Sequence, residues 1–248
     1  MEAATERLER AGCVAAREEA DELVAAAPDV GALEAWIRRR ERGEPLAWIT
    51  GTLRFCGRTV MVDPGVYVPR EQTEALARRA AGLLATGGRA VDLCTGTGVV
   101  AAHLRAAVTG AAVVGVDIDP RAAACARRNG VAAVVGDAGR PPLRPRTCDV
   151  VTAVAPYVPT GAIPFLPADV QRYEPRIALD GGDDGLDLVR RVARAAAGLL
   201  RPGGWLVAEV GGEQDRALGP VLAALGFAPA APWYDEDGDL RGLAVQLG

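Results

Sequence analysis

From residue 73 to its end the chain alternates between helical and strand-like hydrophobic patterns, and no other feature constrains its fold as strongly. Short apolar runs such as Ala90 to Leu93 have the length and composition of fully buried strands. The stretches between them, such as Val99 to Ala107, follow helical spacing. Parallel strands need a crossover connection, and a helix in each crossover covers one face of the sheet. The alternation therefore predicts an α/β fold with a doubly wound, mostly parallel sheet.

The end of the chain departs from this alternation. Two apolar stretches, residues 227–234 and 243–247, flank the turn-rich segment Asp235 to Asp239, which is typical of a hairpin. We therefore expect a seven-stranded sheet that finishes with an antiparallel strand. Before the hairpin, the predicted strands are residues 90–93, 112–116, 132–135, 149–153 and 205–210, and the predicted helices are residues 73–84, 99–107, 120–128, 186–200 and 217–225.

Residues 1–42 predict a small helical domain. Apolar residues recur at helical spacing through this segment, and Asp29 is a plausible N-cap for a helix carrying Leu33 and Ile37. Gly43 and Pro45 end the helical pattern. Residues 43–72 then form a linker with short apolar pieces at residues 48–50, 59–62 and 66–68, which predict a short hairpin. Residues 73–248 make up the α/β domain.

Composition narrows the possible partners and the compartment. The formal net charge of −4 disfavours nucleic acid, whose phosphates attract a basic surface, so a protein or small-molecule partner is expected. The five scattered cysteines form no Cys-x-x-Cys pair and are expected to be reduced. No apolar run approaches the roughly 20 residues of a membrane span. We expect a cytoplasmic protein that binds neither nucleic acid nor membrane.

The sequence offers little support for a metal centre. A single histidine, His103, lies on the predicted helix 99–107, where we expect a structural or solvated role. One acidic cluster has the carboxylates for a metal but lacks the regular spacing of a calcium loop, so we interpret it as solvated charge near a helix N-terminus. Its members are Asp180, Asp183, Asp184 and Asp187.

A glycine-rich loop, Asp92-Leu-Cys-Thr-Gly-Thr-Gly98, follows the first strand of the α/β domain and opens a helix. Glycines at this place let the backbone pass close to a bound nucleotide. Together with Ala101 the loop satisfies the dinucleotide fingerprint, and Asp117 follows Gly98 by 19 residues (117 minus 98), as a ribose-binding acid would. NAD is therefore a competing prediction.

The sign of charge favours S-adenosylmethionine over NAD. The Asp92 carboxylate just before the loop would repel a pyrophosphate but attract the ammonium group of a methionyl moiety. By analogy, the terminal hairpin also fits the methyltransferase version of this fold. Ligands gather beyond the carboxyl ends of parallel strands. There Asp117 can accept hydrogen bonds from the ribose hydroxyls, and Asp137 can accept one from the adenine amino group with the Ala138 amide nearby. Asp119, before Pro120, is interpreted as an N-cap.

Several motifs, in order along nearly the whole chain, resemble the HemK/PrmC family of methyltransferases. They are Gly43-Glu-Pro-Leu-Ala-Trp-Ile-Thr-Gly51, Val68-Pro-Arg-Glu-Gln-Thr-Glu74, Tyr173-Glu-Pro-Arg-Ile-Ala-Leu-Asp-Gly-Gly182 with Asp184-Gly-Leu186, and Glu209-Val-Gly211 with Gln214. The resemblance implies a class I, Rossmann-like sheet, S-adenosylmethionine as cofactor, S-adenosylhomocysteine as product and a glutamine side-chain amide as methyl acceptor. It also implies that the N-terminal domain binds the substrate, although here that domain is about two helices shorter than in the family. The resulting cofactor residues are Arg70, Thr73, Asp92, Cys94, Thr95, Gly96, Gly98, Asp117, Ile118, Asp137 and Ala138.

The acceptor loop departs from the family. Where the family has Asn-Pro-Pro-Tyr, this chain has Val154, Ala155, Pro156 and Tyr157, which are the candidate catalytic residues. In the family the Asn side-chain oxygen and the next backbone carbonyl accept the two amide hydrogens. Ala155 can still offer a carbonyl, whereas the side chain of Val154 has no acceptor. Tyr157 could stack on an acceptor or only form a wall of the pocket.

Three interpretations of Val154 remain open. The site can still take glutamine, with Glu174 or a water as the substitute acceptor. It can instead be adapted to a small molecule or a modified protein substrate without an amide donor, which we favour because an apolar wall suits a less polar acceptor. Finally, methyl transfer can be lost, leaving a protein that only binds S-adenosylmethionine.

Overall fold

The computed structural model describes residues 2–248, so Met1 of the predicted helical domain lies outside it. Its centre is a seven-stranded sheet of order β5-β4-β3-β6-β7-β9-β8. β3 to β7 are parallel, and β9 pairs antiparallel with both β7 and β8. The predicted doubly wound sheet with a terminal antiparallel hairpin is thus confirmed. The strands are β3 (Arg89–Leu93), β4 (Ala112–Asp117), β5 (Ala132–Val135), β6 (Cys148–Ala153), β7 (Leu200–Ala208), β8 (Ala231–Tyr234) and β9 (Leu240–Gln246).

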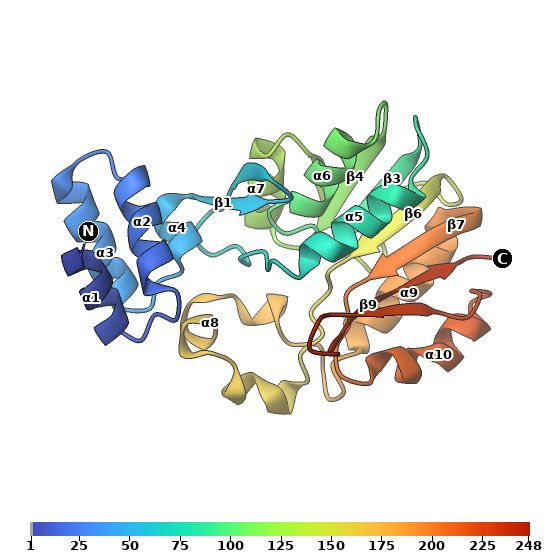
Figure 1. The fold of residues 1–248 in the computed structure, drawn as a ribbon. Coiled ribbons are helices and arrows are strands. Elements are labelled where there is room, and N and C mark those ends of the chain that lie inside the picture. Colours follow the sequence, from blue (N-terminus) through green and yellow to red (C-terminus); the bar gives the residue numbers. More distant parts are fainter. Residues whose placement is uncertain (1) are drawn as a thin grey trace.

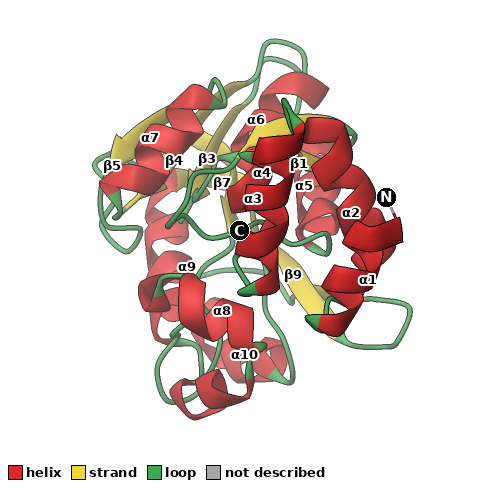
Figure 2. Cartoon of the chain, turned by 90° about the vertical axis from the view of Figure 1, so that its left-hand side faces the viewer, coloured by secondary structure: helices red, strands yellow, loops and turns green. Residues whose placement is uncertain are grey.

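Helices cover both faces of this sheet (Figures 1 and 2). Successive side chains of a strand point to opposite faces, and the two neighbours Val150 and Val151 on β6 accordingly belong to two different hydrophobic cores. Val150 shares its core with residues of α5 (Thr73–Leu83), α6 (Val99–Ala107) and α7 (Pro120–Arg128). Val151 shares the other with α9 (Asp187–Leu199) and α10 (Gln214–Ala224). The apolar strands are therefore buried on both faces of the sheet, as their sequences predict.

The N-terminal segment forms a helical unit with a core of its own, which includes Leu8, Leu23 and Ile37. Its helices are α1 (Glu2–Arg10), α2 (Ala16–Ala26) and α3 (Val30–Glu41). Asp29 caps α3 as predicted, because its side chain accepts a 2.8 Å hydrogen bond from the amide of Ala32. The prediction of helix throughout the segment is wrong between α1 and α2, where Gly12 takes a φ of 84° that helical backbone does not allow.

The linker contains a hairpin, but not at every predicted position. β1 (Thr52–Phe55) and β2 (Arg58–Met61) pair around Cys56 and Gly57, which have φ values of 47° and 75° as a two-residue hairpin turn requires. The predicted strand at residues 48–50 is wrong, because these residues lie in the short helix α4 (Leu46–Thr50). Ala47 and Trp48 of α4 pack against the linker, and the Trp48 indole donates to the Val66 carbonyl at 3.0 Å, whereas Ile49 belongs to the core of the N-terminal helices. Residues 66–68 form no strand and lie along the candidate site instead.

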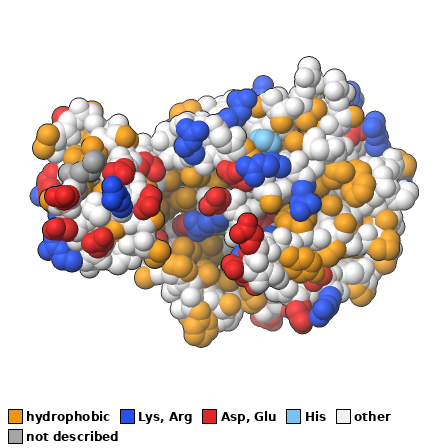
Figure 3. Space-filling view, viewed as in Figure 1, with side chains coloured by type: hydrophobic (Ala, Val, Ile, Leu, Met, Phe, Trp, Pro, Cys, Tyr) orange, Lys and Arg blue, Asp and Glu red, His pale blue; other side chains and the backbone are white. Residues whose placement is uncertain are grey.

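The segment after β6 carries three short helices that the sequence pattern did not predict. They are η1 (Thr160–Phe165), α8 (Ala168–Tyr173) and η2 (Arg176–Ala178). Tyr173 connects this segment to the N-terminal half, since its hydroxyl donates to the Arg42 carbonyl at 3.0 Å and its ring meets Trp48 edge-on. Figure 3 shows a hollow between the N-terminal helices and the rest of the molecule, with hydrophobic side chains on its walls.

Candidate functional site

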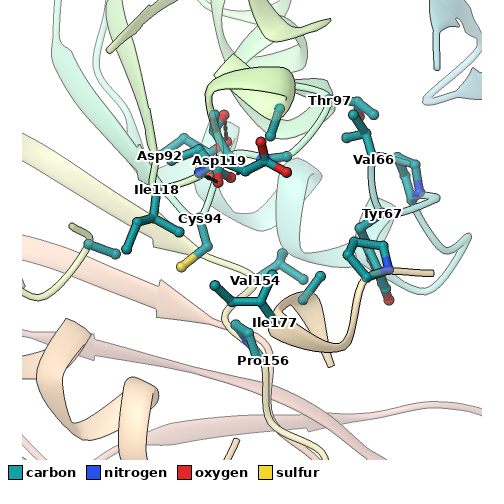
Figure 4. Close-up of a pocket in the computed structure, with 18 of the residues that line it drawn as sticks. Val66, Tyr67, Asp92, Cys94, Thr97, Ile118, Asp119, Val154, Pro156 and Ile177 are labelled. Carbon is teal, nitrogen blue, oxygen red and sulfur yellow. Dashed lines mark hydrogen bonds between the residues drawn. The ribbon is translucent and has the colours of Figure 1, made fainter. Parts of the chain in front are cut away.

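A cavity of about 210 Å³ lies at the carboxyl ends of β3, β4, β5 and β6. This is far more space than one water requires and is of the size that small organic ligands occupy. Three separate stretches of chain line it: residues 65–73 of the linker and the start of α5, residues 92–138 of the sheet loops, and residues 154–191 of the acceptor loop, the following segment and α9. Figure 4 shows acids of the second stretch at one end and Val154, Pro156 and Ile177 at the other.

The glycine-rich loop approaches the cavity in a conformation that most residues avoid. Cys94, Gly96 and Gly98 have φ values of 58°, 54° and 81°. A Cβ on Gly98 would come within 2.9 Å of the Ala126 Cβ, so this glycine lets α6 pack against α7. A Cβ on Gly96 would meet no protein atom within 4 Å, although Gly96 lines the cavity. The loop therefore leaves room where a ligand can lie close to backbone.

Asp92 is almost fully buried beneath this loop, with a relative exposure of 2%. Its carboxylate accepts hydrogen bonds from the hydroxyl of Thr95 at 2.6 Å and from that of Thr152 at 2.7 Å. Desolvation raises the pKa of Asp92 to about 6 despite these bonds. Thr152 was not among the predicted site residues; its only signal is a hydroxyl next to apolar residues in a buried strand.

Asp117 ends β4 and holds the neighbouring loops in place. Its carboxylate accepts from the Gly96 amide at 2.8 Å and from the Asp119 amide at 2.9 Å, and burial raises its pKa. Ile118 lines the cavity and stays 56% exposed, so it offers an apolar surface to a ligand. Asp119 caps α7 as predicted, because it accepts from the Arg121 amide at 2.8 Å.

Asp137 lies at the end of β5 and has a partner that the sequence did not reveal. Its carboxylate accepts from the Gly139 amide at 2.8 Å and pairs with the Arg191 guanidinium at 2.5 Å. Arg191 comes from α9 and also lines the cavity. Ala138, beside Asp137, is buried and lines it as well. Local sequence carries no sign of Arg191, because 54 residues separate it from its partner.

The candidate acceptor loop divides into two parts. Val154 and Pro156 line the cavity, whereas the side chain of Ala155 is buried in a hydrophobic core. Among residues 2–248, no hydrogen bond to the Ala155 carbonyl oxygen is formed. Tyr157 does not line the cavity: its hydroxyl donates to the Glu209 carboxylate at 2.9 Å and accepts from the Gln72 side chain at 3.1 Å.

The linker residues reach the site in different ways. Thr73 lines the cavity, and its hydroxyl donates to Glu209 at 2.8 Å. Thr73 is the first residue of α5, whose N-cap is Gln72. Arg70 does not line the cavity; it pairs with the buried Glu174 at 2.6 Å and lies over the Tyr67 ring, which does line it.

The chain resembles known methyltransferases in sequence. A family model described as "Methyltransferase domain" matches residues 90–172. A release factor glutamine methyltransferase of Geobacter sulfurreducens is 35% identical, with 89% of this chain and 79% of that protein covered. The protein of the same name from Moorella thermoacetica is 42% identical over 77% of this chain and 70% of its own length. The chain belongs to the HemK/PrmC family of methyltransferases.

Another relative of the chain has a different acceptor in its name. The 4-amino-L-phenylalanine/4-methylamino-L-phenylalanine methyltransferase of Streptomyces pristinaespiralis is 36% identical to this HemK/PrmC member, over 77% of this chain and 69% of that protein. Among solved structures, the 16S rRNA N2 G1207 methyltransferase RsmC of T. thermophilus, in complex with AdoMet and guanosine, has a TM-score of 0.55. RsmC is 19% identical to this chain, and the match covers 79% of this chain and 44% of RsmC. At this identity the likeness supports the class I fold alone.

This HemK/PrmC protein is an S-adenosylmethionine-dependent methyltransferase, and its cavity fits that cofactor. Gly96 leaves open space beside a loop amide, Asp92 would be the acid for an ammonium group, and the exposed apolar side chain of Ile118 would lie against a ring. When bound, the cofactor supplies an electrophilic methyl group on a sulfonium sulfur.

Three acids of the cluster after the acceptor loop in this HemK/PrmC protein have local partners. Asp180 pairs with Arg176, and Asp184 and Asp187 pair with Arg190. Within residues 2–248 no group of acids, cysteines and histidine has the arrangement of a metal site. His103 lies on α6 as predicted, and partial burial lowers its pKa. No described helix is long and apolar enough to cross a membrane.

Proposed function

We propose that this HemK/PrmC methyltransferase transfers the methyl group of S-adenosylmethionine to a small, largely apolar acceptor instead of a release-factor glutamine. One observation carries the proposal: Val154 lines the cavity at the place where the family motif supplies the Asn amide oxygen. A valine side chain accepts no hydrogen bond. At this position the acceptor is therefore bound by apolar packing and not by hydrogen bonds.

Glutamine fits such a wall poorly. An amide nitrogen is a weak nucleophile because its lone pair is delocalised into the carbonyl, so the enzyme has to orient it against the sulfonium methyl. With Val154 in place of Asn, one amide hydrogen has no partner from this residue. An unpaired buried donor costs about 1 to 3 kcal/mol, and lost alignment in the transition state adds to that cost.

Two further observations support a small acceptor. The name of the Streptomyces pristinaespiralis relative specifies an amino acid with an aromatic amine as its acceptor. That relative is about as similar to this chain as the relatives named for a protein acceptor are. In addition, Tyr67 and Pro69 of the linker complete the cavity wall. The N-terminal domain, residues 2–42, would then contribute to substrate binding by positioning this linker.

The cofactor roles follow from the geometry, as part of the same proposal. Asp92 attracts the ammonium group of the methionyl moiety, and Asp117 accepts from the ribose hydroxyls. Asp137 and the Ala138 amide bind the adenine amino edge, next to the apolar surface of Ile118. The protein's task in catalysis is to position the acceptor and exclude water, since the sulfonium already activates the methyl group.

Release-factor glutamine remains the second candidate, because the relatives of that name match most of the chain and the Ala155 carbonyl accepts no hydrogen bond from residues 2–248. Glu174 is a weaker substitute for the lost Asn, because its buried side chain does not line the cavity and its Oε1 pairs with Arg70, which leaves only Oε2 without a hydrogen-bond partner in the described chain.

A methylation assay on a release factor and its Gly-Gly-Gln peptide distinguishes the two candidates. We expect weak or absent transfer by the wild type and more by Val154→Asn, which restores the missing acceptor. Val14→Asn is the matched control, because Val14 is fully exposed in the turn before α2. Wild-type turnover equal to that of a release-factor enzyme, unchanged by Val154→Asn, would refute the proposal.

A further inference from the structure

The cavity has two chemically different ends. Its acids and loop amides gather at the cofactor end, as described above. The acceptor end is formed by Tyr67, Val154, Pro156, Pro175, Ile177 and Ala178. Apart from the Tyr67 hydroxyl, every one of these side chains is apolar. Ile177 is 60% exposed although it belongs to this wall, which is the state of a side chain that a ligand would cover.

No free negative charge faces the acceptor end among the residues that line it. The adjoining acid Glu174 is 2% exposed at its side chain and pairs through Oε1 with Arg70 at 2.6 Å, so Arg70 neutralises its charge although the buried Oε2 has no hydrogen-bond partner among residues 2–248. Glu209, on the other side, receives hydrogen bonds from Thr73, Tyr157 and Gln72. A cationic acceptor would therefore find no counter-ion.

The acceptor end also lacks a general base. Tyr67 is the one lining residue there with an ionisable group, and burial raises its pKa to about 12, so it keeps its proton at neutral pH. An acceptor that must lose a proton before it attacks has no group to take that proton. Alkyl amines are charged at neutral pH, with a pKa of about 10.4, and phenols keep their proton, with a pKa of about 10. Carboxylates would bring a charge into an apolar wall.

On this basis we propose that the acceptor is an aromatic amine, which is uncharged at neutral pH and carries an available lone pair. The inference rests on the proposed function, a small apolar acceptor, and specifies its chemical class. The ring lies against Val154, Pro156 and Ile177, which places the amino group toward the cofactor end. The nitrogen lone pair forms the new C–N bond while the methyl–sulfur bond breaks, its electron pair staying on sulfur. The extra proton on the methylated nitrogen then passes to solvent.

Three acceptors that differ only in the reacting group test the inference: p-toluidine, 4-methylbenzylamine and p-cresol. The full-length protein is incubated with labelled S-adenosylmethionine and each compound at neutral pH, with the Gly-Gly-Gln peptide as the fourth acceptor. We expect transfer to p-toluidine to exceed each of the others by at least about tenfold. Equal or faster transfer to the phenol or the benzylamine overturns the aromatic amine but leaves a small-molecule acceptor standing. Transfer to the peptide alone overturns both, and cofactor binding without transfer to p-toluidine also overturns the inference.

A charged variant gives a second readout. Ile177→Asp places a carboxylate in the apolar wall at an exposed position, which the fold tolerates. We expect it to lower the transfer to p-toluidine and to raise that to 4-methylbenzylamine, because it supplies the missing counter-ion. Phe165→Asp is the control, since Phe165 is 87% exposed in the same segment and does not line the cavity. An unchanged preference in Ile177→Asp would contradict the inference.

Discussion

The carboxyl group of Asp92 lies between two hydroxyl donors and has almost no contact with solvent. Its pKa of about 6 in the folded protein exceeds the unfolded value of 3.8, so the folded state binds the proton more tightly. The free energy of unfolding should therefore fall as pH rises from about 4 to about 6, by about 3 kcal/mol from this group. Urea unfolding across this range measures the slope. Asp92→Asn should flatten it, leaving the contributions of Asp117, Glu174 and Glu22, whose pKa values burial raises in the same direction.

Cofactor affinity should depend on the same proton. The ammonium group of S-adenosylmethionine is attracted to ionised Asp92 and not to the protonated acid. We expect the dissociation constant to rise by up to about tenfold per pH unit below pH 6. Titration calorimetry at several pH values measures it, and Asp92→Asn should bind weakly with little pH dependence. A wild-type affinity that is constant from pH 5 to 7 would contradict the role proposed for Asp92.

Tyr157 is held by its hydroxyl outside the cavity. Tyr157→Phe removes one of the donors to the buried Glu209 but leaves Gln72 and Thr73 in place. We expect a loss of about 1 to 3 kcal/mol in unfolding free energy, since the bond is to a charged group, with most of the methyl transfer retained. Chemical denaturation and the methylation assay separate the two effects. Tyr234→Phe is the control, because Tyr234 is 54% exposed; an equal loss in both variants would argue against the Glu209 contact.

The contacts of a single side chain can be predicted from the sequence where that side chain bonds to its own loop. Asp29 and Asp119 follow from the local capping rule, and Asp92 follows from its place before the glycines. Thr152, Arg191 and the contacts of Glu209 with α5 do not follow, because they depend on which strands and helices become neighbours.

Among the secondary-structure elements, the contact between α6 and α7 depends on the absence of a side chain at Gly98. Gly98→Ala would bring a Cβ within 2.9 Å of Ala126 at a φ of 81°, so we expect destabilisation of about 1 to 3 kcal/mol. Gly82→Ala, in α5, meets no atom within 4 Å and should stabilise the protein by about 0.5 to 1 kcal/mol. Thermal unfolding of the two variants tests the opposite signs, and a stabilised Gly98→Ala would show that the loop relaxes.

Helices with a clear start signal are the elements that the sequence predicts best, whereas β7 covers Leu200–Ala208 and not the predicted residues 205–210. α6 and α7 begin and end at the predicted residues, because each combines a clear start signal with a regular apolar face. α4 and α8, which span 5 and 6 residues, are too short to show helical periodicity. Their positions depend on contacts such as Trp48 with Tyr173, which join residues far apart in the chain.

For the molecule as a whole, the ion pair between Arg70 and Glu174 joins the linker to the segment after the acceptor loop, across 104 residues. Each single change, Arg70→Gln or Glu174→Gln, leaves one group without its partner, and we expect Glu174→Gln to cost about 1 to 3 kcal/mol. The double variant should cost less than the sum of the two, by about 0.5 to 3 kcal/mol of coupling. Denaturation of all four proteins completes the cycle, and strict additivity would show that the pair does not hold the two segments together.

The cavity wall comes from three stretches of chain, the last of which ends at Arg191 on α9. A growing polypeptide therefore has no complete ligand site until that helix has left the ribosome. S-adenosylmethionine therefore cannot assist the earliest steps of folding, and once the site is complete it stabilises the folded state by mass action. Fragments that stop before α9 should gain no protection against proteases from the cofactor, while the intact chain should gain it in proportion to occupancy.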